Sequence, residues 1–395
     1  NTKRYIIVGF IVVVCLLGFL ASYLNKKYID TNVIAKNIFI EGIDISNLTK
    51  KEAINYINKK IHPGNIVLNY DGKSNIISPS DIDLKYNTDE VVNEAYNYTK
   101  TKSYFKNIKR ILNLNKSSKN LKLKSTYNET KLSNKIQNIY DLIQLKMKNA
   151  SIYISDSGNI SISKSVVGKE LDMVSTKESI YDAIKNRNYQ PINLIVNKKE
   201  PNITTQDVKS VNSLLSEFST KFSTSNENRA TNIMLSSKAT SDVLLMPGEE
   251  FSYNNLTGKR TKANGYKDAP VIINGKLEND VGGGVCQVSS TLFNSVLYSG
   301  LDVTSRKNHS LKSSYVPIGR DAMVSDGGSD FRFKNPYSHP VYIKNTVSNG
   351  VITSKIYGND LDKKNITIKV EPYMKNELDA AKTYIEYRDL NGNIE

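Results

Sequence analysis

The sequence predicts an α+β protein with one N-terminal membrane helix, a duplicated α+β module and a mixed α+β domain with one prominent helix. Three observations predict this organisation: an uncharged apolar run, a hairpin-and-helix pattern that occurs twice, and a glycine-rich turn that opens a long apolar helix. The 395 residues suggest two or three folded units. With 39% hydrophobic and 24% charged residues, the composition is globular and excludes a disordered tail or a multi-span transporter.

The apolar run occupies residues 5–24, which read YIIVGFIVVVCLLGFLASYL and carry no charge. A helix of this length spans a hydrocarbon core of roughly 30 Å. Its end, FLAS, is unlike the small-residue site of a cleaved signal peptide, so we expect an uncleaved signal-anchor. Basic residues flank both ends equally, so they do not set the orientation. Because the head is too short to carry a function, we expect 1–27 to be cytoplasmic head and anchor, with the bulk of the chain extracytoplasmic at the cell wall.

The net charge of +15, from 54 Lys and Arg against 39 Asp and Glu, suits an anionic partner. The basic residues are scattered and form no nucleic-acid motif, and the expected location also argues against nucleic acid. A solvated basic surface is one interpretation, and attraction to anionic wall polymers or lipid headgroups is the other. The two cysteines, Cys15 and Cys286, exclude a disulfide-stapled module and a multi-cysteine zinc site. We expect no metal and no cofactor.

Residues 28–200 carry the duplicated pattern. Strands at 66–70 and 76–78 around Asp71-Gly72, followed by a helix that opens at 87–90, form the first copy. The second copy has strands at 152–154 and 160–163 and a helix that opens at 175–178. Each of these helices opens on a cap residue with Glu three positions later, which is typical of a capping box. Another helix opens in the same way at Thr49. A helical span at 127–148 separates the copies.

No residue set in this half is typical of catalysis, which favours binding or spacing. Together with the segment ISPSDIDLKYNTDEVVNEAY at 77–96, the arrangement resembles the peptidoglycan-binding module of Gram-positive anchored proteins. That resemblance implies peptidoglycan as the partner. After a break at 198–202, a linker helix is expected over 201–221, capped by Thr204 or Thr205 and running through Val208 to Phe218. A globular domain at 222–358 and a strand-rich tail at 359–395 complete the chain.

The first chemical signal is the segment GGGVCQ at 282–287. Glycines allow close backbone approach, and the apolar stripe that follows predicts a helix from Val285 to Ser299. Cys286 therefore falls in the first helical turn, where unpaired amides and the helix dipole stabilise a thiolate. A thiol nucleophile would use His309 as base and Asp321 or Asp330 as the orienting carboxylate. The alternative is that Cys286 is a small packing residue at the helix start.

The carboxylates form a rival site. Glu249 and Glu250 follow the turn Pro247-Gly248, and a strand can point only one of them into a cleft. Cleavage of a β-1,4 glycan needs an acid, whereas a lytic transglycosylase needs only one acid/base because the 6-hydroxyl of the sugar displaces the bond. The alternative is that these carboxylates cap turns or form ion pairs. Seven further residues are candidates for substrate binding: Gly283, Gly284, Gln287, Arg320, Asp330, Tyr253 and Tyr315.

Three blocks carry a second resemblance: LLMPGEEFSYNNLTGKRTKANGYKDAPVIINGK, GGGVCQVSSTLFNSVLYSGL and NHSLKSSYVPIGRDAMVSDGGSDFRFKN. In this order and spacing they resemble the VanW family, which implies an exported protein at the cell wall. On the family pattern, Glu249 is the Glu that directly follows Pro-Gly. The preferred hypothesis is therefore peptidoglycan binding with glycan cleavage by Glu249. A Cys286/His309 amidase, peptidase or acyl transferase on stem peptides, and a non-catalytic wall-binding or scaffold protein, are the alternatives.

Overall fold

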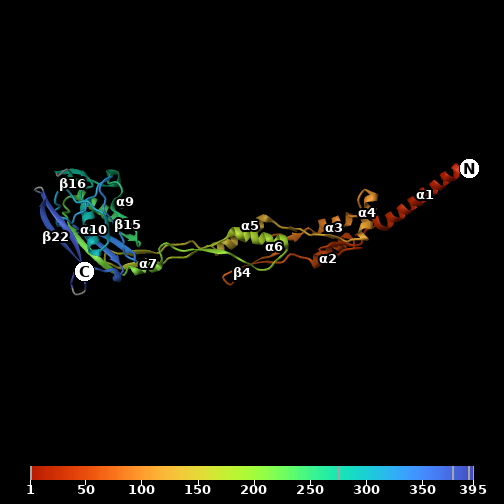
Figure 1. The fold of residues 1–395 in the computed structure, drawn as a ribbon, viewed down its shortest axis with the longest axis horizontal. Coiled ribbons are helices and arrows are strands. Elements are labelled where there is room, and N and C mark those ends of the chain that lie inside the picture. Colours follow the sequence, from red (N-terminus) through yellow and green to blue (C-terminus); the bar gives the residue numbers. More distant parts are fainter. Residues whose placement is uncertain (1, 274–275, 376–377, 390–391, 395) are drawn as a thin grey trace. The chain divides into compact units, whose positions relative to one another are not determined.

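The computed structural model describes residues 2–273, 276–375, 378–389 and 392–394 (Figure 1). It has the predicted α+β architecture, and its contacts divide the chain into two compact units. The first unit comprises Asn1–Leu145 and Gly168–Lys199, and the second comprises Lys146–Val167 and Glu200–Glu395.

The N-terminal helix α1 (Thr2–Leu24) confirms the helix predicted over the apolar run, and a short π-helical turn, η1 (Asn25–Ile29), continues it. The most apolar 18-residue window of Lys3–Ile29 has a mean hydropathy of 2.7. Within the described residues this stretch is the one helix long and apolar enough to cross a membrane. Its length and composition fit a membrane anchor or a signal peptide.

The rest of the first unit has two hydrophobic cores, each built from short strands and helices. The first core is rich in isoleucine and includes Ile38, Ile40 and Ile57. Its elements are β1 (Ile38–Ile40), β2 (Ile43–Asp44), α2 (Lys50–Lys60), α3 (Thr88–Asn97), α4 (Tyr104–Leu114) and β6 (Lys119–Leu121). The strand order is β2-β1-β6. The predicted capping box at the start of α2 is confirmed, because Thr49 and Glu52 exchange side-chain and backbone hydrogen bonds.

The second core of this unit lies between a hairpin and two helices. Asp71 and Gly72 both have positive φ, which a two-residue hairpin turn requires, and this confirms the predicted turn. The elements are β3 (Ile66–Tyr70), β4 (Lys73–Ile77), η2 (Pro79–Asp81), β5 (Lys85–Tyr86), β7 (Ser125–Thr126), α5 (Glu129–Ile143), β10 (Gly168–Leu171), α6 (Met173–Asn186), β11 (Ile192–Asn193) and β12 (Val196–Lys199).

Two predicted capping boxes are wrong. Helix α6 begins two residues earlier than expected, because the carboxylate of Asp172 accepts hydrogen bonds from the backbone and hydroxyl of Ser175. At the start of α3, Asn87 makes no capping bond with the helix backbone, since its side chain is engaged by Glu90 and by the amide of Lys124. At α6 another polar residue, Asp172, takes the capping position. At α3 the side chain of Asn87 forms other hydrogen bonds in place of the capping bond.

The second unit is built on two antiparallel sheets, ordered β13-β21-β20-β14 and β15-β19-β18, with three separate hairpins. Its elements are β8 (Ser151–Ile154), β9 (Ile160–Ser163), α7 (Thr205–Ser210), β13 (Ser213–Lys221), α8 (Glu227–Ala239), β14 (Val243–Leu245), β15 (Glu250–Ser252), α9 (Tyr253–Thr257), η3 (Lys262–Asn264), β16 (Asp268–Ile273), β17 (Lys276–Val281), α10 (Val285–Ser299), β18 (Asp302–Ser305), β19 (Arg332–Lys334), β20 (Val341–Ser348), β21 (Val351–Gly358), η4 (Asp360–Asp362), β22 (Asn365–Lys375) and β23 (Leu378–Arg388).

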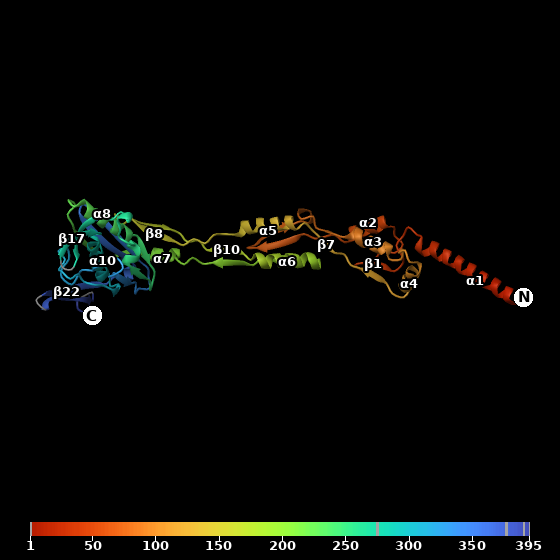
Figure 2. The ribbon, with the colours of Figure 1, turned by 90° about the horizontal axis from the view of Figure 1, so that it is seen from above.

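Helix α10 lies inside this unit, among its strands (Figures 1 and 2). Its bounds confirm the helix predicted from Val285 to Ser299. Every residue of α10 except Cys286 and Tyr298 is buried. Most of its buried polar side chains are hydrogen-bonded, some of them to other elements; Thr291 bonds to Thr220 on β13, for example. The helix is thus buried all round, and Cys286 is one of the two places where it reaches a surface.

Two stretches differ from the sequence-based expectations. The linker helix was expected to reach Phe218, but α7 ends at Ser210 and the following residues form the strand β13. The apolar spacing there also fits a strand. A β-bulge between Leu214 and Ser216 shifts the register of β13 on β21. The second hairpin, β8–β9, belongs to the second unit, because Ile154 is buried against Tyr342 and its neighbours there. The tail strands are the β22–β23 hairpin; residues 376–377, 390–391 and 395 of the predicted tail lie outside the described residues.

Candidate active site

The glycine-rich turn before α10 packs against the protein's own backbone. Gly284 is the N-cap with φ of +108°. A Cβ on Gly283 would lie 2.6 Å from the carbonyl oxygen of Ala269, so only glycine fits beside β16. A Cβ on Gly284 would lie 2.9 Å from the side chain of Ile233 on α8. These glycines therefore set the helix start tightly between α8 and β16.

Cys286 is the second residue of α10 and lines a cleft of about 870 Å³. Its Sγ lies 3.4 Å from the carbonyl oxygen of Val324. The backbone N–H groups of Val285 and Gln287 donate to the carbonyls of Gly282 and Gly284, at 3.1 Å each. The N–H of Cys286 has no hydrogen-bond acceptor among the described residues. A first-turn amide of this kind stabilises negative charge beside the sulfur.

His309 and Asp321 lie together beside Cys286. The ring Nδ1 of His309 is 2.6 Å from Asp321 Oδ2, and the backbone N–H of His309 donates to the same oxygen at 2.6 Å. The ring and Cys286 both line the cleft, and Cys286 is close enough to raise the pKa of His309. Because Nδ1 is held by the carboxylate, Nε2 is the ring nitrogen left to act on a neighbouring group. The three side chains form a thiol, imidazole and carboxylate in sequence.

The electrostatics of this triad favour an ion pair. Burial disfavours the charged imidazolium, but hydrogen bonds to Asp321 and Cys286 outweigh it and raise the pKa of His309 to about 9. Burial also disfavours the Asp321 carboxylate, yet its bonds to His309, and the charge of Arg306, hold the pKa of Asp321 below its ordinary value. At neutral pH, His309 is therefore protonated and forms an ion pair with Asp321.

The polar face of α10 holds the segment that carries Asp321. Ser289 Oγ donates to the carbonyl of Ala322 at 2.6 Å, and the Ala322 amide donates to Ser290 Oγ at 2.9 Å. Asn294 Nδ2 donates to the carbonyl of Arg320 at 2.8 Å. Arg306 adds a salt bridge of 2.9 Å to Asp321. The helix that carries Cys286 thus also positions the segment that carries Asp321.

Glu249 does not line this cleft. Its carboxylate accepts a hydrogen bond from the backbone N–H of Met246 at 2.8 Å and closes the turn before β15. Glu250 accepts from Thr304 at 2.6 Å and pairs with Arg332. Two of the carboxylates from the predicted glycan-cleaving site therefore stabilise a turn and a sheet edge. The structure brings Cys286, His309 and Asp321 together and leaves Glu249 apart from them.

The predicted substrate-binding residues divide between the cleft and the interior. Gly284, Gln287 and Tyr315 line the cleft, whereas Gly283 does not. Asp330 accepts bonds from Ser252, Asn254 and Arg332, and Arg320 stacks on Phe218 and Tyr298 away from the cleft lining.

Tyr253 is fully buried. Its hydroxyl bonds to Ser236 and to the carbonyl of Val285, so it supports the helix start and is not available to stack on a sugar. In the cleft, by contrast, Tyr315 is half-buried and lines the open space.

Sequence reasoning missed Arg229, which lies on α8 and lines the cleft. Its Nη2 donates to Gln287 Oε1 at 2.8 Å. It stands far before the GGGVCQ segment in an unremarkable helix, so no local pattern marks it. The Ser289-Ser290 pair was a usable signal, because adjacent buried hydroxyls on an apolar helix need partners on a neighbouring segment.

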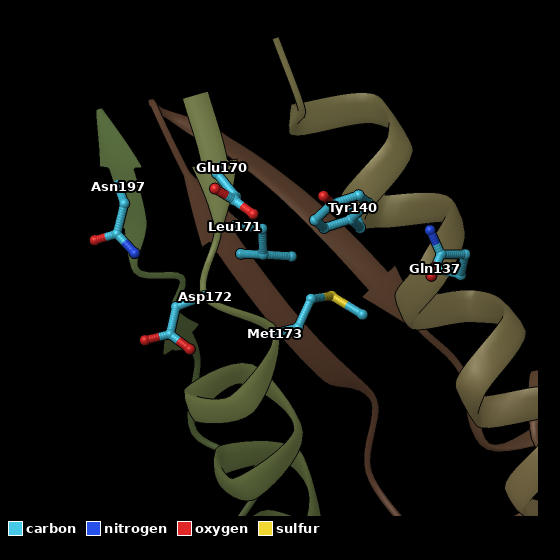
Figure 3. Close-up of a pocket in the computed structure, with 7 residues that line it drawn as sticks. All are labelled: Gln137, Tyr140, Glu170, Leu171, Asp172, Met173 and Asn197. Atoms are coloured by element: carbon cyan, nitrogen blue, oxygen red, sulfur yellow. The ribbon is translucent and has the colours of Figure 1, made fainter. Parts of the chain in front are cut away.

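The first unit has its own hollow of about 470 Å³ (Figure 3). It is lined by Gln137, Tyr140, Glu170, Leu171, Asp172, Met173 and Asn197. Asp172 turns its carboxylate to the start of α6, which it caps. The described lining holds no nucleophile beside a base. Within the described residues, no group of three or more Asp, Glu, His or Cys side chains is placed to hold a metal ion.

The domain with the cleft is recognised by comparison with known families. Residues 228–357 match the family model described as "VanW like protein". This segment is a VanW-like domain. Residues 76–193 match the model described as "Putative peptidoglycan binding domain". The VanW-like domain contains the whole Cys286 triad, and the two matches together support a cell-wall-associated function.

Two curated relatives resemble the chain in part. It is 46% identical over 147 residues to an uncharacterized protein, YoaR, of Bacillus subtilis, which covers 37% of this chain and 48% of YoaR. It is 36% identical over 114 residues to the vancomycin B-type resistance protein VanW of Enterococcus faecalis, covering 28% of this chain and 42% of that protein. The chain thus spans less than half the length of either relative. No solved structure matches it significantly.

Proposed function

We propose that this protein is a membrane-anchored cysteine acyl transferase or amide hydrolase that acts on the stem peptides of peptidoglycan. The single observation that carries the proposal is the placing of Cys286, His309 and Asp321 beside one another at the N-terminus of α10. Cys286 and His309 line the cleft, and Asp321 bonds to His309. The peptidoglycan-binding match supports the substrate, because it lies in the same chain. The apolar helix α1 supports the location.

The proposed reaction proceeds by covalent catalysis. The Cys286 thiolate attacks the carbonyl carbon of a peptide bond, and the N–H of Cys286 together with the α10 dipole stabilises the developing oxyanion. His309 gives its Nε2 proton to the leaving amine as the C–N bond breaks, which leaves a thioester on the sulfur. An incoming amine or water then loses a proton to His309, attacks the thioester and regenerates the thiolate. An amine acceptor gives transfer, and water gives hydrolysis.

The geometry favours this reaction over glycan cleavage by Glu249. An acid/base must reach the glycosidic oxygen, whereas the Glu249 carboxylate accepts a hydrogen bond within a turn and does not line the Cys286 cleft. The carboxylates that line the Cys286 cleft are Asp280 and Asp326, and Asp326 is paired with Arg260 at 2.6 Å. A reaction of Cys286 uses groups that line the cleft, and Glu249 is not among them.

The test is to incubate the full chain with purified sacculi and to identify the products by mass. The proposal predicts altered stem peptides, either shortened, released or newly joined, with intact glycan strands. Alkylation of Cys286 is expected to abolish these products. Anhydro-muropeptides that persist after alkylation would contradict the proposal and support Glu249. Binding without any product would leave a wall-binding protein.

A further inference from the structure

The cleft of the VanW-like domain holds a half-buried cation, Arg229, that makes no salt bridge with a carboxylate among the described residues. Arg229 is half-buried on α8, and its described side-chain partner is the neutral oxygen of Gln287. Gln287 is fixed in that orientation, because its amide group donates to Thr220 and to the carbonyl of Lys221. By contrast, the other arginine of the cleft, Arg260, is paired with Asp326.

The remaining charges that line the cleft do not compensate Arg229. Lys312 is exposed and of the same sign, and Asp280, which is also exposed, makes no described salt bridge with Arg229. Burial lowers the pKa of Arg229, while the charges of Tyr315 and Cys286 raise it, so the guanidinium lies within electrostatic reach of the reactive thiol. A half-buried guanidinium with free donors in a cleft is suited to a planar anion.

We infer that Arg229 binds a free carboxylate of the acyl donor and thereby selects stem peptides with such a group close to the bond that Cys286 attacks. This inference rests on the proposed function. The interaction replaces water on the guanidinium with a charge-assisted pair and orients the substrate carbonyl at the sulfur. Gln287, which follows Cys286 in the chain, couples the position of the guanidinium to the position of the nucleophile.

The test uses two synthetic stem peptides that contain the bond altered in sacculi. They differ in one group: the carboxylate nearest that bond is free in one and a carboxamide in the other. We expect a preference of about 10- to 100-fold in kcat/KM for the free carboxylate. The Arg229→Gln variant is expected to lose that preference, because kcat/KM should fall far more for the free-carboxylate peptide than for the carboxamide peptide. Arg229→Lys should keep part of it.

The controls separate the possible failures. Lys238→Gln removes a charge from the exposed end of the same helix and should keep the preference unchanged. An equal loss on both peptides in Arg229→Gln would assign the residue a structural role and overturn the inference. Activity that survives Cys286→Ala would instead overturn the proposed function. A wild-type protein that does not distinguish the peptides would also overturn the inference.

A second surface, on the first unit, is independent of the cleft. Helix α4 carries two exposed apolar side chains seven residues apart, Phe105 at 84% and Leu112 at 56% exposure. Residues with this spacing lie on the same face. The helix also presents Lys106 and Lys109, both exposed. Its opposite side is anchored by buried Asn107 and Leu114, so the exposed face is not covered by this unit.

The position of α4 indicates what covers that face. The hydroxyl of Tyr104, the first residue of α4, donates to the carbonyl of Ala21 in the last turn of α1 at 3.1 Å. Phe105 is the next residue, and its ring lies edge-on to that of Tyr104. If α1 spans the membrane, the end of this helix marks the bilayer surface. Phe105 is therefore held at the depth of the headgroups.

We propose that α4 is an interfacial helix that inserts Phe105 and Leu112 into the outer surface of the bilayer, with Lys106 and Lys109 among anionic headgroups. Aromatic and aliphatic side chains flanked by lysine are typical of helices that lie in this interface. The contact would fix the first module against the membrane beside its anchor. It requires α1 to be retained, which the mass of the purified chain establishes.

The chain has no tryptophan, so one introduced indole reports its own environment. The Phe105→Trp variant, reconstituted through α1 into phosphatidylcholine vesicles, is expected to be quenched by brominated lipid. Adding phosphatidylglycerol should increase the quenching. Leu142→Trp is the matched control, because Leu142 is 78% exposed on α5 of the same unit. Equal quenching of the two variants, or none at position 105, would overturn the proposal; no response to phosphatidylglycerol would overturn the role of the lysines.

Discussion

Two clusters of charged side chains in the VanW-like domain show what separates a structural from a reactive arrangement. Around β15, Glu249, Glu250 and Asp330 are all engaged by backbone amides, hydroxyls or Arg332. Beside α10, Asp321 is also fully engaged, but its bonds orient a histidine, and that histidine faces a thiol in an open cleft.

The difference lies in where the hydrogen-bond chain ends. In the β15 cluster it ends inside the fold, so a substitution there changes stability. In the Cys286 cluster it ends at His309, which lines the cleft together with Cys286, so we expect a substitution there to change reactivity. Residue type alone does not distinguish the two clusters, because both contain carboxylates in glycine-containing loops.

The largest expected difference between the clusters is in the response to removal of their central residue. Cys286→Ala should lower turnover of stem peptides by about 10⁴-fold or more, because the covalent step is lost. Glu249→Gln should leave turnover within about twofold, since the carboxylate only closes a turn. Rates are measured on the same purified peptide, with circular dichroism as the check on folding. A larger loss of turnover in Glu249→Gln than in Cys286→Ala would contradict the account and assign the reactive role to the β15 cluster.

Asp321→Asn should lower kcat by about 10²- to 10⁴-fold, because the histidine loses its orienting carboxylate. The same change removes a bond that stabilises the imidazolium, so the pKa of His309 should fall. Titration of His309 by NMR measures that shift directly. As the matched substitution in the other cluster, Asp330→Asn should leave the pKa of His309 unchanged, and an equal shift in both variants would contradict the account.

The pH dependence should show the ion pair. His309 has a folded pKa near 9, above its ordinary value of 6.5, so its contribution to stability is fully present below pH 6.5 and is lost as pH rises through about 9. Activity should fall about tenfold per pH unit above 9, as the imidazolium loses its proton. A pH–rate profile for kcat/KM checks this. A plateau that extends well beyond pH 9 would show that the protonated ring is not required.

The smallest expected effect concerns the support of the triad. Asn294→Ala removes the bond to the Arg320 carbonyl and should reduce the free energy of unfolding by about 1–3 kcal/mol. It should also lower activity modestly, because the Asp321 segment loses one tie to α10. Urea denaturation and turnover measure the two effects. Lost stability with unchanged activity would show that the Ser289 and Ser290 bonds suffice.

Much of the fold follows from local patterns. Three elements were predictable from the sequence: the apolar helix, the Asp71-Gly72 hairpin and the helix from Val285 to Ser299. In each, the spacing of apolar residues and the residues at the turns or ends indicate the same structure. The strand β13 was not, since its apolar spacing fits a helix equally well and pairing with β21 decides between them. Burial of the second hairpin against Tyr342 is likewise a long-range effect.

The sequence allowed the residues of the candidate site to be named, but it did not show which of the named candidates lie together. Cys286, His309 and Asp321 could be named from residue type and from the helix start, but Asp330 was an equal candidate for the orienting carboxylate. The structure distinguishes them by their partners, because His309 bonds to Asp321 while Asp330 is bound by Ser252 and Arg332. Arg229 could not be found, because its relation to Gln287 exists only once α8 packs against α10.

The most direct measurement is the intact mass of the protein after it is mixed with a defined stem peptide and quenched in acid. The account predicts an added mass equal to the acyl part of the peptide, located on Cys286 by fragmentation and absent from Cys286→Ala. Rapid turnover of stem peptides by a chain that never carries this adduct, and that is equally active without the thiol, would contradict it.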